Sequence, residues 1–327
     1  MFKQFALGTA LLAAAGTAPA QSQSQSPKEI NFGIISTESS QNLKQDWAPL
    51  LADMEKRTGL KVNAFFAPDY AGVIEAMRFG KVQVGWFGNK SAIEAVDRAG
   101  GEVFAQVVNV DGSIGYNSMV SVHKDSPYKT LDELLKNAKS LSFGIGDPNS
   151  TSGYLVPSYY IFAKYKLDPK TTFKNTRGAN HETNILAVAN KQVDAAVHSS
   201  DVLERIEKRQ PEVAAKVRVI WKSPLIAGDP LVWRKDLDAD SKAKVKQFML
   251  SYGKGSGAEG ARELAILTKL TLGGFRDSGN AQLSPTRQLE LFREKTKLEA
   301  DAGMGAQEKA GKIEAIDKKL AELQQAG

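Results

Sequence analysis

Three consecutive hydroxyl residues, Ser150, Thr151 and Ser152, have the types and spacing to bind an anion. They follow a short apolar stretch, Leu141–Ile145, that predicts a strand, and they precede an apolar helical pattern that starts near Gly153. The start of a helix presents unpaired N–H groups and the positive end of its dipole, so this turn suits a tetrahedral oxyanion. The alternative is an ordinary helix cap made by one hydroxyl, with the others in water.

Five further residues are candidates for the same kind of site. His181 begins a helical pattern and could donate to an anion, although a capping or surface histidine is the alternative. Asp201 stands at a strand-to-helix junction and Asp229 within a Gly-Asp-Pro turn, and their alternatives are a helix N-cap and a simple turn. Tyr70 and Tyr116 fall on loops expected at the carboxyl ends of strands, where α/β proteins bind ligands, and packing is their alternative role.

Patterns that would indicate catalysis or a bound cofactor do not occur. The chain has no cysteine, which excludes disulfides, thiolate metal sites and a thiol nucleophile. Its three histidines form no HExxH or other paired spacing, and there is no GxSxG turn. Gly144-Ile145-Gly146 lacks the third glycine of a dinucleotide-binding loop, and Gly253-Lys254 lacks the earlier glycine of a phosphate-binding loop. The sequence therefore predicts a binding protein without metal or cofactor rather than an enzyme.

The composition is that of a folded globular protein. The 327 residues are 42% hydrophobic and 24% charged, with 43 Lys and Arg against 37 Asp and Glu. The length suggests about two domains. Charges of both signs are interspersed, and no basic run carries interleaved aromatic residues, so we expect no nucleic-acid partner.

The N-terminus has the pattern of a secretory signal peptide over residues 1–20. Lys3 provides the positive charge, Phe5–Ala15 is apolar, and Ala18-Pro19-Ala20 matches the small-residue cleavage pattern. The apolar stretch is short for a membrane anchor, which is the alternative. Residues 21–26 alternate Gln and Ser and form a polar tether. We therefore expect an exported protein of the bacterial periplasm.

Apolar runs alternate with helical patterns along the rest of the chain, as in an α/β fold with largely parallel sheets and helices on both faces. Strands are expected at Ile30–Ile35, Val62–Phe66, Val82–Phe87, Val103–Val108, Ser118–His123, Leu141–Ile145, Val193–Val197, Val217–Trp221 and Leu231–Trp233. Helices are expected at Leu43–Met54, Tyr70–Phe79, Ser91–Arg98, Leu131–Asn137, Ser152–Tyr165, Thr183–Asn190 and Val202–Arg209, with a mostly helical remainder.

The break in rhythm after residue 110 predicts two lobes. We place the crossings between them near His123 and Ser223, so that residues 27–122 and 224–300 form one lobe and residues 123–223 the other. Residues 301–327 form a helical C-terminal extension. A cleft between two lobes is a usual place for a small-molecule site.

Many separate motifs, in the same order over about 30–291, resemble the periplasmic phosphonate-binding proteins of ABC transporters, the PhnD type. The number of motifs makes the resemblance specific. They are Pro68–Gly72, Trp86–Asn89, Glu94–Ala99, Gly146–Gly153, His181–Asn184, Ile220–Ile226, Gly228–Pro230 and Val232–Lys235.

The resemblance implies a type II periplasmic-binding fold, whose two lobes close on a ligand as a flytrap does, and delivery of that ligand to a membrane permease. By matching positions, it implies that Asp201 and Asp229 receive the ammonium group of 2-aminoethylphosphonate, since a zwitterion needs carboxylates at one end and donors at the other. It also implies that Ser150, Thr151, Ser152 and His181 hold the phosphonate oxygens. Tyr70 would donate to the ligand head or pack beside it, and Tyr116 would line the cleft.

Two positions depart from the pattern of the family. Members that favour 2-aminoethylphosphonate carry a glutamate where this chain has Asp201, which is shorter by one methylene, so the ammonium contact could pass through water or the ligand preference could shift. Phe87 replaces a frequent tyrosine and removes a hydroxyl. We keep the phosphonate class, with another phosphonate, phosphite or phosphate as alternative ligands. An exported phosphate-ester hydrolase is the alternative function.

The C-terminal segment carries its own apolar stripe. Ile313, Ile316, Leu320 and Leu323 recur at helical spacing with Glu and Lys between them. This stripe predicts a helix that either lies on its own lobe or pairs with a second subunit, as the resemblance also suggests. A monomer and a homodimer stay open at this point.

Overall fold

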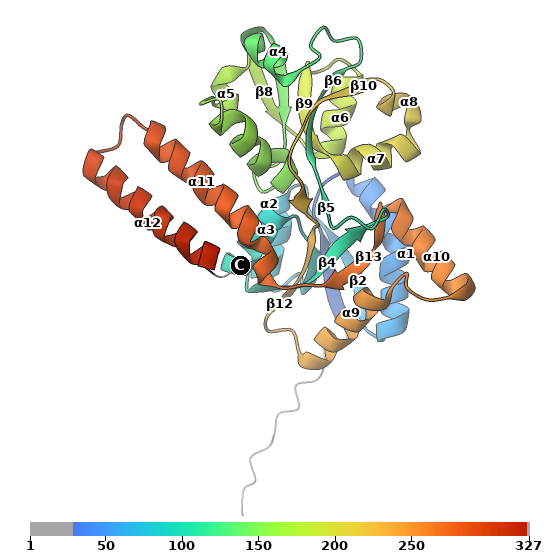
Figure 1. Ribbon diagram of the computed structural model, residues 1–327. Helices are drawn as coiled ribbons and strands as arrows, with labels where there is room; N and C mark the ends of the chain where they lie inside the picture. Colours follow the sequence, from blue (N-terminus) through green and yellow to red (C-terminus); the bar gives the residue numbers. More distant parts are fainter. Residues whose placement is uncertain (1–28, 326–327) are drawn as a thin grey trace, which may run out of the picture.

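The computed structural model describes residues 29–325. The predicted signal peptide and polar tether lie outside the described residues. Within them, a six-stranded and a five-stranded sheet each carry their own hydrophobic core (Figure 1). We call the part built on the six-stranded sheet lobe 1 and the part built on the five-stranded sheet lobe 2. No helix in the described part of the chain is long and apolar enough to cross a membrane.

The sheet of lobe 1 has the order β13-β4-β12-β3-β1-β2. Strands β1, β2 and β3 are parallel, as predicted, but β12 returns from the far end of the chain and inserts between β3 and β4, antiparallel to both. The strands are β1 (Glu29–Ile34), β2 (Lys61–Phe66), β3 (Val84–Trp86), β4 (Gly101–Asn109), β12 (Pro230–Arg234) and β13 (Leu272–Asp277). The helices are α1 (Ser40–Thr58), α2 (Tyr70–Arg78), α3 (Asn89–Arg98), α9 (Ala239–Ser251), α10 (Gly257–Lys269) and the short η4 (Asn280–Leu283).

Helix α1 illustrates how the local sequence builds lobe 1. Ser39 caps its start by accepting from the backbone N–H of Asn42 at 3.2 Å, and Gly59 ends it with a φ of 70°. The apolar stripe predicted from the sequence is buried in the core. Burial of each such side chain contributes about 1.5–3 kcal/mol. The buried residues of this stripe are Leu43, Trp47, Leu50, Leu51 and Met54.

The sheet of lobe 2 has the order β10-β6-β9-β7-β8, in which β7 is parallel to β8 and β9 while β6 is antiparallel to β9 and β10. The strands are β6 (Ser118–His123), β7 (Ser142–Ile145), β8 (Asn175–Gly178), β9 (Ala195–Ser199) and β10 (Val217–Lys222). The helices are α4 (Leu131–Lys136), η1 (Ala138–Ser140), η2 (Thr151–Leu155), η3 (Ser158–Ala163), α5 (Pro169–Thr172), α6 (His181–Ala189), α7 (Ser200–Arg209) and α8 (Pro211–Ala214).

Two local predictions in lobe 2 need correction. The single helix expected over 152–165 is present as one continuous run over 151–163, but it is π-helical in η2 and η3, with Val156 and Pro157 α-helical between them. Asp201 is not the N-cap of α7, because Ser199 holds that position and accepts from the backbone N–H of Val202 at 3.3 Å. Asp201 instead lies in the first turn of the helix.

The lobes are joined by a small two-stranded ribbon of β5 (Gly115–Tyr116) and β11 (Ile226–Ala227) (Figure 1). The first crossing therefore lies at β5 rather than near His123, whose strand already belongs to the five-stranded sheet. The second crossing lies just after Ser223. The two strands of the ribbon approach so closely here that a Cβ on Gly115 would lie 2.3 Å from the carbonyl oxygen of Ile226. Position 115 therefore requires glycine.

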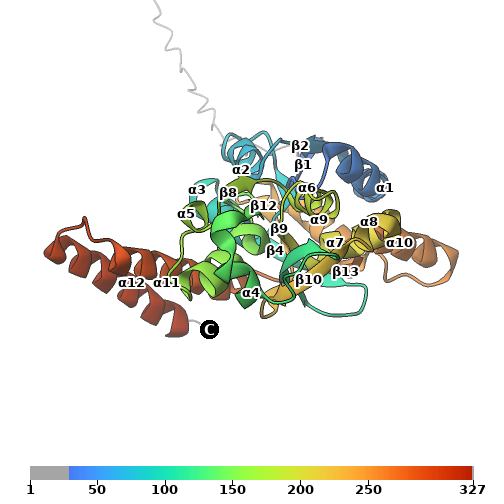
Figure 2. The same cartoon turned by 90° about the horizontal axis from the view of Figure 1, so that it is seen from above.

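The C-terminal region is a helical hairpin of α11 (Ser284–Ala300) and α12 (Ala306–Gln325). Helix α11 begins against both lobes, where it packs on α3 and on η3, and the hairpin extends outward from there (Figures 1 and 2). The base of α11 is tied to α3 of lobe 1 by Arg287 and Asp97, which form two bonds of 2.6 Å. Helix α12 packs along α11, and its predicted stripe is covered there, with Ile316 and Leu320 buried. Ile313 and Leu323 of the same stripe are half-buried. A homodimer stays a prediction.

Candidate functional site

Five helices begin at one cavity between the lobes. Tyr70 starts α2, Gly88 precedes α3, Thr151 starts η2, His181 starts α6 and Ser199 precedes α7, and all five residues line the cavity. Each helix start carries unpaired N–H groups and about half a positive charge. Their convergence from both lobes favours an anion in the cavity.

All eight residues proposed from the sequence line this cavity. They come from segments of both lobes and of the connecting ribbon, and all are buried except Asp201, which is half-buried. Their contact with a ligand stays a prediction. The eight are Tyr70, Tyr116, Ser150, Thr151, Ser152, His181, Asp201 and Asp229.

Ser150 and His181 form a neutral pair of polar groups at one end of the cavity. Ser150 caps η2, because its Oγ accepts from the backbone N–H of Gly153 at 2.9 Å, and the same oxygen lies 3.3 Å from Nε2 of His181. Burial lowers the pKa of His181 to about 3, so its imidazole is uncharged at neutral pH. Its Nδ1 is buried without a hydrogen-bond partner. The cap suggested as the alternative for this turn is therefore present, but it lies inside a cavity.

The hydroxyl of Thr151 connects the two lobes. Its Oγ1 accepts from the backbone N–H of Lys90 in lobe 1 at 2.9 Å, and a Cβ on Gly88 would lie 3.1 Å from this oxygen. The hydroxyl proton is not used in that bond, so it remains a donor. The next residue, Ser152, is held by its carbonyl oxygen, which accepts from Oγ of Ser118 at 2.6 Å.

Two carboxylates, Asp201 and Asp229, line the same cavity. Burial, with the neighbouring Asp201, raises the pKa of Asp229 to about 8, and burial raises the pKa of Asp201 to about 6. Tyr116 and Trp86 beside Asp229 act against this rise of its pKa, yet Oδ1 of Asp229 is buried without a partner. A cationic donor would supply both the missing hydrogen bond and the compensating charge.

Arg205 also lines the cavity, and the sequence reasoning missed it. It lies four residues after Asp201 on α7, and this spacing puts both residues on one face of the helix. That spacing was the one feature of the sequence that could have placed Arg205 in the site. Its guanidinium crosses to lobe 1. There Nε donates to Oε1 of Glu38 at 2.6 Å and Nη1 donates to Oγ1 of Thr271 at 3.0 Å.

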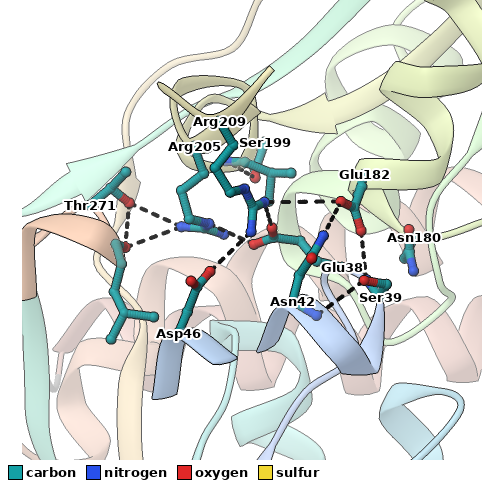
Figure 3. A network of polar contacts seen from close by, with 12 residues as sticks. Glu38, Ser39, Asn42, Asp46, Asn180, Glu182, Ser199, Arg205, Arg209 and Thr271 are labelled. Atoms are coloured by element: carbon teal, nitrogen blue, oxygen red, sulfur yellow. Dashed lines mark hydrogen bonds and ion pairs between the residues drawn. The ribbon is translucent and has the colours of Figure 1, made fainter. Parts of the chain in front are cut away.

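Arg205 is part of an interlobe network, which we define as Glu38, Asp46, Glu182, Arg205 and Arg209 (Figure 3). Arg209 of lobe 2 donates to Glu38 and, at 3.0 Å, to Asp46, both in lobe 1. In the opposite direction, Glu182 of lobe 2 accepts from the backbone N–H of Ser39 and from Nδ2 of Asn42, each at 2.6 Å. Charged side chains of each lobe therefore form hydrogen bonds or ion pairs with groups of the other lobe.

The described residues contain no group of three or more His, Asp or Glu side chains that could hold a metal ion. The donors at the Ser150 end are hydroxyls, an uncharged imidazole and helix N-termini. This set suits an oxyanion with several acceptor oxygens, held by many neutral donors in a dry cavity.

Comparison with known proteins identifies the family. The family model described as "ABC transporter, phosphonate, periplasmic substrate-binding protein" matches residues 32–283. The chain belongs to this family.

Individual members of the family are similar over nearly the whole chain. The phosphonates-binding periplasmic protein of Escherichia coli is 52% identical over 305 residues, which cover 93% of this chain and 88% of that protein. A crystal structure from Pseudomonas aeruginosa, a binding protein component of an ABC phosphonate transporter, is 54% identical with a TM-score of 0.88, over 92% of this chain and 98% of that one.

A more distant structure shows the same fold. PhnD1 of Prochlorococcus marinus, solved in complex with methylphosphonate, has a TM-score of 0.71 at 22% identity, over 82% of this chain and 99% of that one. These findings confirm the resemblance, the type II periplasmic-binding fold and the expectation of a non-enzymatic binding protein. The chain is a substrate-binding component of a phosphonate ABC transporter.

Proposed function

We propose that this protein captures 2-aminoethylphosphonate in the periplasm and delivers it to the permease of its transporter. One observation carries the proposal: a single interlobe cavity holds hydroxyl, imidazole and helix N-terminal donors together with the carboxylates of Asp201 and Asp229. A zwitterion with a phosphonate at one end and an ammonium at the other complements both groups.

The phosphonate binds at the start of η2 in this proposal. Ser150, Thr151 and Ser152 face the cavity with the backbone of a helix start, and His181 adds a neutral N–H donor. Tyr70, the first residue of α2, faces the same end and is fully buried. Closure of the lobes removes water, which strengthens each of these hydrogen bonds.

The ammonium group binds between Asp201 and Asp229. Without a cation, burial disfavours ionisation of both carboxylates, Asp201 further raises the pKa of Asp229, and Oδ1 of Asp229 has no donor. Phosphate, phosphite or methylphosphonate would bind the hydroxyl and imidazole donors but would leave Asp201 and Asp229 without a compensating positive charge. The aminated ligand therefore has an advantage that the simple anions lack. Tyr116, which lines the cavity together with Asp229, forms the wall of the cleft in this proposal.

The similar proteins agree with the ligand class. The Escherichia coli relative is named for phosphonates in general, and the Prochlorococcus marinus structure holds methylphosphonate. The choice of an aminated phosphonate depends on the two carboxylates of this chain rather than on those names.

Isothermal titration calorimetry on the ligand-stripped protein tests the proposal. We expect micromolar or tighter binding of 2-aminoethylphosphonate and at least ten-fold weaker binding of methylphosphonate, phosphate and phosphite. The absence of heat with every one of these ligands would refute phosphonate capture. Equal affinity for the aminated and non-aminated ligands would refute the ammonium site alone.

We further propose that residues 1–20 direct export and are removed. Mass spectrometry of the protein from a periplasmic extract should find an N-terminus at Gln21. Retention of the full N-terminal sequence would contradict this. The predicted homodimer is tested by mass photometry of the same material, in which a single mass near the monomer would argue against it.

A further inference from the structure

A second cavity adjoins the ligand cavity at its two carboxylates. It is lined by five residues that also line the first: Trp86, Tyr116, Asp201, Arg205 and Asp229. The hydroxyl residues of the η2 turn and His181 line only the first cavity. A phosphonate on that turn, with its ammonium at the carboxylates, would therefore leave the second cavity beyond the nitrogen.

The far wall of this second cavity is apolar. Leu43 and Trp47 of α1 contribute from one side, and Leu270 and Leu272, between α10 and β13, from the other. All four side chains are at least nine-tenths buried. The two cavities meet at the carboxylate pair, since Asp201 and Asp229 line both.

The charges around the second cavity exclude an anionic group. Glu38 lines it, and both of its oxygens are taken by Arg205 and Arg209. Arg205 is thus already paired with Glu38, while Asp201 and Asp229 face the same space. An additional carboxylate there would meet three acidic side chains, which is unfavourable in a buried place.

The chemistry of an ammonium group fits this arrangement. A primary ammonium has three N–H donors, and two carboxylates can accept two of them. If an alkyl group replaces the third hydrogen, the nitrogen keeps its positive charge and its two remaining donors. The alkyl group then needs an apolar space next to the carboxylates, and the second cavity is such a space.

We propose that the site also accepts 2-aminoethylphosphonates with a small apolar substituent on the nitrogen, placed in the second cavity against Leu270 and Leu272. This inference rests on the proposed function and names a wider substrate class for the same site: N-alkylated aminoalkylphosphonates. The apolar wall sets the preference among substituents, since each buried methylene is worth about a fourfold gain in affinity.

Calorimetry with four ligands tests the inference: 2-aminoethylphosphonate and its N-methyl, N-propyl and N-carboxymethyl derivatives. We expect the N-methyl and N-propyl compounds to bind within about threefold of the parent or more tightly, and the N-carboxymethyl compound about thirtyfold more weakly or worse. An N-propyl compound as weak as the N-carboxymethyl one would overturn the inference. So would equal affinity for all four, because the substituent would then lie in solvent.

Variants that fill the second cavity test whether the alkyl group on the ligand nitrogen lies there. Leu272→Phe, and Leu270→Phe as a second variant, should weaken the N-propyl compound at least tenfold while leaving 2-aminoethylphosphonate unchanged. Thermal melting of each variant checks that it folds. If neither folded variant discriminates between the two ligands, the inference fails. Failure of 2-aminoethylphosphonate itself to bind the unmodified protein would instead refute the proposed function, so the two failures are distinguishable.

Discussion

Arg205 of lobe 2 donates from Nε to Oε1 of Glu38 in lobe 1 at 2.6 Å, and the two side chains are only 7% and 1% exposed. Burial alone would raise the pKa of Glu38, but the adjacent Arg205 and Arg209 hold it below its usual value. The carboxylate is therefore ionised in the closed arrangement. Since its partners belong to the other lobe, this compensation requires the lobes to be together.

The first prediction concerns this ion pair. Glu38→Gln should weaken binding of 2-aminoethylphosphonate by about 2–3 kcal/mol, or roughly 30- to 150-fold, because closure would bury Arg205 without its carboxylate. Calorimetry measures the affinity. The control is Lys208→Gln, which removes an exposed pair with Glu204 on the same helix and should have little effect. An unchanged affinity in Glu38→Gln would show that the pair does not contribute to closure.

The second prediction concerns the hydroxyl turn. Ser152→Ala should weaken every phosphonate by about 1–3 kcal/mol, since a ligand oxygen would lose a buried donor. Ser140→Ala is the matched control, because Ser140 is exposed and its hydroxyl bonds only the carbonyl of Asn137 nearby. Titration of both variants with methylphosphonate measures the difference. If the two variants bind alike, the Ser152 hydroxyl does not contact the ligand.

The third prediction separates the two ends of the ligand. Asp201→Asn and Asp229→Asn should each weaken 2-aminoethylphosphonate by at least tenfold more than methylphosphonate, since only the former carries an ammonium group. Parallel titrations of both ligands measure the ratio. Equal losses for the two ligands would argue that the carboxylates support the fold of the site and not the ammonium.

The fourth prediction follows from the pKa of Asp229, which burial and Asp201 raise to about 8. Below pH 8 the free protein carries a proton on this carboxyl, whereas an ammonium ligand requires the ionised form. Binding at pH 7 should therefore release a proton, and the affinity should rise as the pH increases from 6 towards 8.

Calorimetry at pH 7 in two buffers of different ionisation enthalpy counts the released protons. Asp229→Asn is the control and should release fewer protons on binding, because its side chain has no carboxyl proton to lose. Identical proton counts in the two proteins would contradict the assignment of the proton to Asp229.

Local patterns predicted much of this protein. The hydroxyl turn, the helix that begins at His181 and the apolar stripe of α1 are properties of neighbouring residues, and the structure has each where it was expected. The same is true of the parallel direction of β1, β2 and β3, which the helices between these strands imply. The π-helical form of η2 and η3 was not predicted, because an apolar run has the same pattern in both helix types.

The sequence by itself determined the strand-turn-helix units, the donor-rich turn and the family, since these depend on residue type and short spacing. Tertiary structure alone decided that β12 inserts between β3 and β4, that α12 packs on α11, and that Arg205 reaches Glu38 across 167 residues of chain. It also decided the raised pKa values of Asp201 and Asp229. The physical reason is that burial and long-range pairing arise only when distant segments exclude water from one another, and no local spacing encodes which segments these are.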